Sequence, residues 1–305
     1  MVLGEITAAL SILDRARKWW DGRKRPPADS VATRFVRLME SHGVHRNQIP
    51  RFIGHGLTLK DVQDDAALLA KLDEALLDAV CAQFAVRREW LDGAEPQAHL
   101  VHDFYKQPEE FAAFLENLIS GHPTGDVTGM VLAPTETHTD AESLIIFEEP
   151  IGTVGDKLIR RYHLVAGGPF TYWKSRAYLT AGVASAWKRG VYVQGRKVPG
   201  REITQLALGK ALLGWHGKGI WSIRGDRWSP EDMALRPDAF LSGIDPERDG
   251  FGIQSALRLW LDLERQGLMG TGINAVNDID TRQLFEQVLD SRVAFTARGP
   301  QNGER

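Results

Sequence analysis

The hydrophobic pattern of this 305-residue chain changes from helical to strand-like near residue 125, and this change limits the folds open to it. Between residues 30 and 119, apolar side chains recur every three or four positions, the spacing of amphipathic helices. After that, the short apolar runs 130–132, 143–149 and 158–165 have the pattern of strands. The segment 120–127 between them is polar and contains glycine and proline, so we expect a domain boundary there.

The predicted fold class is α+β. The strands precede a helix over 171–188, a strand over 191–195 and a helix over 202–213, an order that favours an antiparallel sheet. We also expect one helix over 98–119. The chain then divides into an amphipathic helix and basic linker over 1–29, a helical domain over 30–119, a basic α+β domain over 126–227 and a helical C-terminal region over 228–305.

Composition excludes several classes of protein. With 43% hydrophobic and 25% charged residues, the chain is globular rather than disordered. Its single cysteine, Cys81, allows no intrachain disulfide or cysteine-based zinc site, and it lies in a leucine-rich stripe where we expect burial. No apolar run reaches the length of a membrane span and no signal-peptide pattern is present, so we expect a cytoplasmic protein.

Charge is unevenly distributed along the chain. The net charge is −3, yet residues 151–227 contain 14 Lys and Arg against three acids. The segments on its N-terminal side are acidic: 61–119 has 13 acids against four cations, and 120–150 has six acids and no Lys or Arg. Such segregation indicates a module that meets something anionic, such as a nucleic acid, an anionic small molecule or an acidic surface.

Aromatic side chains alternate with the cations of this basic module. Arg and Lys neutralise phosphates, while aromatic rings stack on bases. The stripe Trp173, Ala177, Ala184 and Trp187 has the spacing of a helix core, which leaves the cations as the functional candidates. The candidate contacts to a nucleic acid or anionic ligand are Arg160, Arg161, Lys174, Arg176, Lys188, Arg189, Arg196, Lys197 and Arg201.

Candidate catalytic and metal sites are weaker. Glu148 and Glu149 are neighbours on a predicted strand, so their side chains point to opposite faces, and we expect them to pair across the hairpin with Arg160 and Arg161. The spacing of His99, His102 and Asp103 suits a metal site on a helix but brings no third strong ligand. We therefore predict no catalytic residue, no metal and no cofactor.

A motif at the end of the first helical domain points to a family. Phe84-Ala85-Val86, followed by Trp90-Leu91-Asp92-Gly93, comes after a leucine-rich helical run over 68–84. This sequence resembles the end of a lambda-repressor-like (XRE or Cro/C1-type) helix-turn-helix domain, with the resemblance covering about residues 30–93. It implies that Trp90 and Leu91 are buried and that a recognition segment spans 55–63, although Pro50 and Asp61 depart from the family pattern there.

The resemblance makes cations of the N-terminal region candidates for DNA contact. These are Arg23, Lys24 and Arg25 on the linker and Arg46, Arg51, His55 and Lys60 on the domain. The leading hypothesis is a DNA-associated transcriptional regulator, a homodimer that binds double-stranded DNA. The alternative is a non-enzymatic adaptor that uses the helix-turn-helix remnant to dock a protein, and the third is an enzyme acting on nucleic acids or nucleotides.

Overall fold

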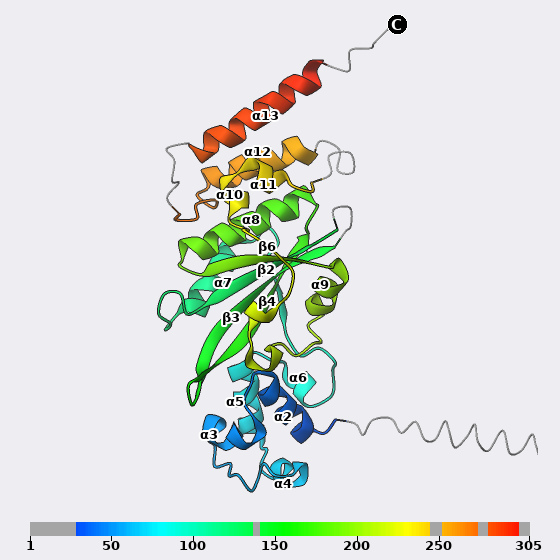
Figure 1. Ribbon diagram of the computed structural model, residues 1–305, viewed down its shortest axis with the longest axis vertical. Helices are drawn as coiled ribbons and strands as arrows, with labels where there is room; N and C mark the ends of the chain where they lie inside the picture. Colours follow the sequence, from blue (N-terminus) through cyan, green and yellow to red (C-terminus); the bar gives the residue numbers. More distant parts are fainter. Residues whose placement is uncertain (1–28, 137–140, 245–251, 274–279, 299–305) are drawn as a thin grey trace, which may run out of the picture.

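The computed structural model describes residues 29–136, 141–244, 252–273 and 280–298. The predicted helix over 4–22 and the linker cations Arg23, Lys24 and Arg25 lie outside these residues. The described chain is elongated: helices of the N-terminal domain lie at one end, a sheet occupies the middle, and C-terminal helices are stacked at the other end (Figure 1).

The N-terminal domain consists of short helices: α2 (Val31–Ser41), η1 (Arg46–Gln48), α3 (Ile49–Ile53), α4 (Asp65–Leu69), α5 (Glu74–Phe84) and α6 (Arg88–Leu91). The Ser30 side chain caps α2, and Gly43 ends it in the left-handed region at φ +86°. Cys81, Trp90 and Leu91 are buried in the core of this domain, as predicted. The leucine-rich run is two helices rather than one, because Asp73 caps a new start at α5.

The predicted recognition segment is not a helix. Residues 54–64 form turns between α3 and α4. Gly54, His55 and Gly56 all have positive φ, which stops helix propagation. Beyond them, the Asp61 carboxylate accepts from both the backbone N–H and the hydroxyl of Thr58, closing a local turn. The recognition segment implied for residues 55–63 is therefore a series of turns.

The family-like motif has a clear structural role. Phe84 is fully buried, and Ala85 takes the left-handed conformation at φ 53°, the backbone shape that commonly ends a helix. This reversal directs Val86 inward, where it pairs with His99 as an isolated β-bridge. The motif thus ends α5 and turns the chain toward the sheet.

The central sheet has six strands: β1 (Val101–Asp103), β2 (Thr128–Pro134), β3 (Glu142–Val154), β4 (Lys157–Pro169), β5 (Tyr192–Val198) and β6 (Asp226–Trp228). Their order is β1-β4-β3-β2-β5-β6. The meander β2–β3–β4 is antiparallel, but β5 lies parallel to β2 and β1 parallel to β4. The sheet is therefore mixed, and the prediction of an antiparallel sheet is wrong, because α8 returns the chain for a parallel pairing.

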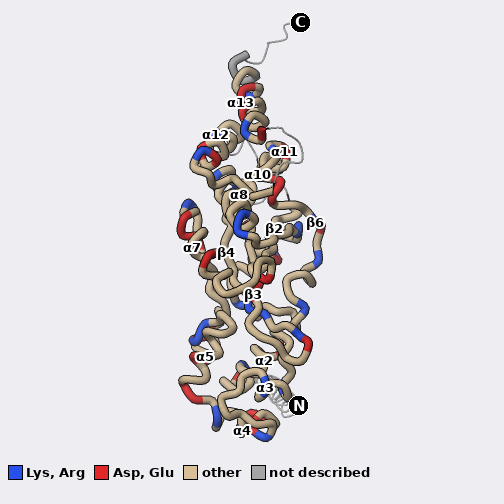
Figure 2. Tube along the Cα trace, turned by 90° about the vertical axis from the view of Figure 1, so that its left-hand side faces the viewer, with Lys and Arg blue, Asp and Glu red and all other residues tan. Residues whose placement is uncertain are grey.

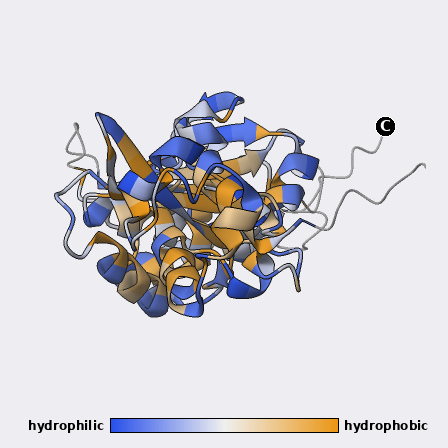
Figure 3. Ribbon diagram, turned by 90° about the horizontal axis from the view of Figure 1, so that it is seen from below, coloured by the Kyte–Doolittle hydropathy of each residue, from blue (hydrophilic) through white to orange (hydrophobic). Residues whose placement is uncertain are grey.

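Helices cover both faces of the sheet, consistent with an α+β fold (Figure 1). On one face lie α7 (Pro108–Ile119) and α8 (Trp173–Lys188); then come α10 (Asp232–Leu235), α11 (Pro237–Leu241), α12 (Gly252–Arg265) and α13 (Thr281–Arg298). On the other face lie α9 (Gly200–Ala207), η2 (Trp215–Gly217) and η3 (Ile220–Ser222). Apolar residues concentrate on the strands and on the inner sides of the helices (Figure 3).

Two helix predictions need correction. Residues 98–119 do not form one helix: β1 precedes α7, because 101–103 pair with β4 and Pro108 then starts the helix. The predicted helix over 202–213 is shorter, since α9 stops at Ala207 and Gly209 follows at φ +64°. His102 and Asp103 consequently lie on an extended strand, where the helical spacing considered for a metal site does not apply.

The long β3–β4 hairpin joins the sheet to the N-terminal domain. Val154 and Ile159 from its tip are buried in the core of that domain. The Lys157 ammonium donates to the Gly43 carbonyl at 2.9 Å, just beyond the end of α2. The two parts of the molecule therefore share a hydrophobic core and do not behave as units on a free linker.

Two buried histidines lie at this junction. His42 packs against the rings of Phe84 and Tyr162, with ring centroids 4.6 and 5.5 Å away. His99 accepts a hydrogen bond from the Leu213 N–H at 3.3 Å. Burial lowers the pKa of His42 from 6.5 to about 4 and that of His99 to about 3, with the neighbouring His42 adding to the second effect. Both rings are neutral in the folded protein near pH 7.

The junction should lose stability in mild acid. Because the unfolded histidines titrate near 6.5, the unfolded state binds more protons below that pH, so the stabilisation is complete above pH 6.5 and falls as pH drops toward 4. His42 alone accounts for about 3 kcal/mol of this change. Urea unfolding followed from pH 7.5 to 4 should show the decline. His42→Phe should flatten it, and the exposed control His216→Asn should not; an unchanged profile in His42→Phe would contradict the assignment.

Candidate nucleic-acid interface

One face of β5 carries a row of polar and aromatic side chains. The strand register aligns Tyr192, Gln194 and Arg196 with Thr128, Met130 and Leu132 of β2, so all six share a face. This is the face covered by α9 and the 213–223 segment, opposite α8. Beyond β5, the short edge strand β6 places Arg227 directly across from Arg196. The outer edge of the sheet therefore presents two arginines side by side.

Arg196 is buried without a charged partner. Its residue surface is 6% exposed, and its Nε donates to the Ile223 carbonyl at 3.3 Å. The buried Nη1 has no hydrogen-bond partner in the described part of the chain. Burial lowers the pKa of Arg196, and the positive charge of Arg227 lowers it further. Like charges across two strands destabilise a sheet unless something anionic lies between or beside them.

Aromatic rings gather at the start of the strand that carries Arg196. Tyr192 and Trp221 are 42% and 38% exposed, and their rings are nearly parallel at 24° with centroids 6.3 Å apart. Trp187, at the end of α8, meets the Tyr192 ring edge-on at 4.9 Å. Exposed rings beside cations are the combination that nucleic acids and nucleotides use, since rings stack on bases and guanidinium groups bind phosphates.

A buried carboxylate holds Trp221 in place. Glu148 is 1% exposed and accepts from the Trp221 indole N–H at 2.9 Å and from the Ile220 N–H at 3.0 Å. Arg160 lies 3.5 Å from it. At Gly219, with φ +71°, an added Cβ would lie 2.7 Å from Glu148 Oε2, so only glycine lets the loop approach this closely.

The adjacent carboxylate, Glu149, is also buried, and it anchors side chains on the other face of the sheet. It is 4% exposed and is contacted by Arg161 at 2.5 Å and by His122 and His163 at 3.0 Å each. Burial would raise its pKa, but the hydrogen bonds from His163, Arg161 and His122 outweigh this and lower the pKa from 4.5 to about 2. Arg161 also donates to the Ala82 carbonyl of α5, which links this cluster to the N-terminal domain.

The Glu148 and Glu149 pairs with Arg160 and Arg161 were predicted, and they are present. Because of these ion pairs, Arg160 and Arg161 are not among the cations that remain free. Arg189 is likewise paired with Glu116. Among the predicted contacts of the basic module, the described structure leaves Lys188, Arg196, Lys197 and Arg201 without an ion pair, and Lys174 lies over the Trp173 ring at 4.9 Å.

Arg176 was expected among the exposed cations, and this is wrong. It is 1% exposed and donates to the carbonyls of Phe170, Phe240 and Ser242, which joins α8 to the α11 region. Its guanidinium also stacks on the Phe170 ring at 3.6 Å. Burial lowers its pKa to about 9. Arg176 is a structural residue, because its donors are already used by the protein itself.

The DNA contacts predicted in the N-terminal domain also divide into residues engaged within the protein and residues that are exposed. Arg46 donates to the Val62 carbonyl and pairs with Asp65 at 2.6 Å, so its head group is engaged internally. Arg51, His55 and Lys60 are exposed on α3 and the following turns, at the free end of the molecule (Figure 1). These three, and not Arg46, are available for an external partner.

Sequence reasoning missed part of the interface. It did not select Trp221 or Arg227, because the loop 214–223 and the strand β6 are too short to carry a periodic signal. Gln194 lies on a strand that was predicted, but it carries no charge and was not selected. The cations Arg224 and Arg227 were visible in the charge count, and Figure 2 shows Lys and Arg recurring along the segment that leads through β6. Only the pairing of β6 with β5 places Arg227 beside Arg196.

No helix in the described ranges has the length and apolarity needed to cross a membrane. Among the same residues, no group of three His, Cys, Asp or Glu side chains is arranged to hold a metal ion. Comparison with family models, curated proteins and solved structures returns no match for this chain.

Removing the charge of Glu148 should release the Trp221 loop. In Glu148→Gln, the amide replaces one acceptor oxygen with a donor that faces N–H groups, so we expect a loss of about 1–3 kcal/mol and faster amide exchange over 214–223. Hydrogen–deuterium exchange measures this directly. Glu149→Gln is the matched control on the opposite face: it should leave exchange over 214–223 unchanged. Equal effects of both substitutions on this loop would refute the anchoring role.

Proposed function

We propose that this protein is a non-enzymatic, nucleic-acid-binding regulator whose β5–β6 face contacts the phosphate backbone. The observation that carries the proposal is the cross-strand pair Arg196 and Arg227, which lacks any carboxylate partner among the described residues; the same strand β5 carries Tyr192, whose exposed ring lies against that of Trp221. A phosphate group would supply the missing acceptors for both guanidinium groups.

The helix-turn-helix resemblance supports DNA as the nucleic acid. Within that resemblance, Arg51, His55 and Lys60 would supply contacts from the free end of the N-terminal domain. Because residues 54–64 form turns instead of a recognition helix, we propose that this end binds the DNA backbone more than it reads bases. A regulator built this way would bind duplex DNA with strong salt dependence and modest sequence preference.

A specific observation favours the adaptor as the second candidate. Leu59 and Leu69 are 58% and 49% exposed on the same end of the N-terminal domain, whereas Arg46 is engaged internally. Exposed leucines beside cations suit a protein partner, since DNA backbone contacts gain little from aliphatic side chains. In this reading the domain docks a protein while the β5–β6 face still meets an anion.

The central test is salt-dependent binding to labelled duplex DNA, with single-stranded DNA and RNA of the same length in parallel. Arg196→Gln with Arg227→Gln should weaken binding and reduce the slope of log K against log salt by about one for each phosphate contact removed. Arg258→Gln with Arg265→Gln, an equal charge change on α12, should leave the slope unchanged. Binding that ignores salt, or that survives the first pair of substitutions, would remove the β5–β6 face from the contact surface.

A second pair of variants separates regulator from adaptor. If the N-terminal domain contacts DNA, Arg51→Gln with Lys60→Gln should weaken duplex binding at every sequence, and Leu59→Ser with Leu69→Ser should not. The adaptor predicts that neither pair changes DNA affinity. Titration of the same labelled duplex with both double variants distinguishes the two outcomes, with circular dichroism confirming that each remains folded.

A further inference from the structure

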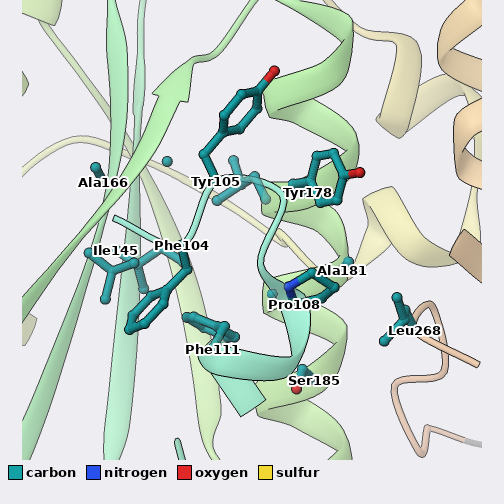
Figure 4. Close-up of a pocket in the computed structure, with 14 residues that line it drawn as sticks. Phe104, Tyr105, Pro108, Phe111, Ile145, Ala166, Tyr178, Ala181, Ser185 and Leu268 are labelled. Atoms are coloured by element: carbon teal, nitrogen blue, oxygen red, sulfur yellow. The ribbon is translucent and has the colours of Figure 1, made fainter. Parts of the chain in front are cut away.

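A pocket lies on the opposite face of the sheet from the proposed nucleic-acid surface. It is formed where the β1–α7 loop, α7, β4 and α8 meet, with Leu268 at one side (Figure 4). The space left unfilled is about 540 Å³, including solvent at the mouth. The pocket shares no residue with the β5–β6 face, so an inference about it is independent of the proposed function.

Small residues create this space. Gly167 on β4 and Ala181 and Gly182 on α8 line it, so both walls include positions with little or no side chain. At Gly182, an added Cβ would lie 3.4 Å from the Phe111 ring, which is ordinary contact distance. Protein interiors are normally close-packed, and atoms that line a gap forfeit dispersion contacts on one side. An occupant would restore those contacts.

The lining restricts the chemistry of that occupant. None of the described residues that line the pocket is charged, and most of the surface that they form is carbon from aromatic rings and aliphatic side chains. The Ser185 hydroxyl already accepts from Arg189 at 2.7 Å. The hydroxyls of Tyr105 and Tyr178 lie on the outer side of their rings in Figure 4. A charged group here would lose its hydration without gaining a partner.

Aromatic rings form one side of the pocket. Phe104 and Phe111 meet edge-to-face at 74° with centroids 5.5 Å apart, and Tyr105 and Tyr178 do the same at 74° and 5.8 Å. Edge-to-face pairs leave ring faces and edges available to a further ring in the same arrangement. An enclosed cavity lined by Leu, Ile and Phe side chains binds benzene, so an apolar pocket lined by rings suits a small aromatic molecule.

We propose that the pocket between β4 and α8 binds a small, uncharged aromatic molecule. Small residues make room for it, the rings of Phe104 and Phe111 contact it, and the absence of charge in the lining excludes ionised analogues. The site belongs to the sheet module and gives this protein a ligand-binding activity separate from its contact with nucleic acid.

Toluene and benzoate, which differ mainly in charge, are the probes for this site. Toluene should bind the full-length protein saturably and raise its melting temperature, and nuclear Overhauser contacts should connect the toluene protons to the methyl groups of Ile145 and Ala181. Benzoate at the same concentration should do neither. Equal binding of both probes, or no saturable toluene binding, would overturn the proposal.

Filling the pocket gives a second measurement. Ser185→Leu, at a half-buried position, and Ala181→Leu, at a buried one, should each reduce toluene affinity at least tenfold. Ala113→Leu adds a leucine at an exposed position of α7 and should leave the affinity unchanged. If Ala181→Leu does not fold, Ser185→Leu still decides the result. Undiminished toluene binding in a folded, filled variant would refute the site.

Discussion

The arrangement of this molecule depends on two neighbouring buried carboxylates in the middle of β3. Because successive side chains on a strand point to opposite faces, Glu148 and Glu149 act on different sides of the sheet. Glu148 holds the loop that carries Trp221, and Glu149 holds Arg161, which in turn donates to the N-terminal domain. Burying a carboxylate without enough hydrogen-bond donors costs free energy. The groups that donate to Glu148 and Glu149 are therefore held in position.

The β3–β4 hairpin extends from these carboxylates to the N-terminal domain. Both strands have 13 residues, far more than their neighbours, and their tip reaches the core of the N-terminal domain through Val154 and Ile159. The domain is therefore fixed against the sheet by shared apolar burial as well as by polar contacts. Two neutral buried histidines, His42 and His99, lie at the same junction and make its stability sensitive to protonation.

The same sheet separates two kinds of surface. Its outer edge at β5–β6 brings together guanidinium groups without acidic partners and exposed rings, which suits an anionic polymer. Between the sheet and α8, by contrast, small residues leave an uncharged apolar pocket. The alternation of side chains along strands permits this division, because a single strand can present a charged residue to one face and a small one to the other.

The sequence by itself determined part of the elements and the local pairs of this protein. Apolar periodicity located β2–β5 and α8, and adjacency on a strand predicted the pairs of Glu148 and Glu149. These features depend on residues close together in the chain or across one hairpin, so spacing alone reveals them. The burial of Trp90 followed from the family resemblance of the motif around Phe84. Tertiary structure decided the parallel pairing of β5 with β2, the burial of Arg176 and the pairing of Arg46 with Asp65. It also decided that Arg196 meets Arg227. Whether a cation is free depends on which distant carbonyls and carboxylates fold against it, and no local pattern records those partners.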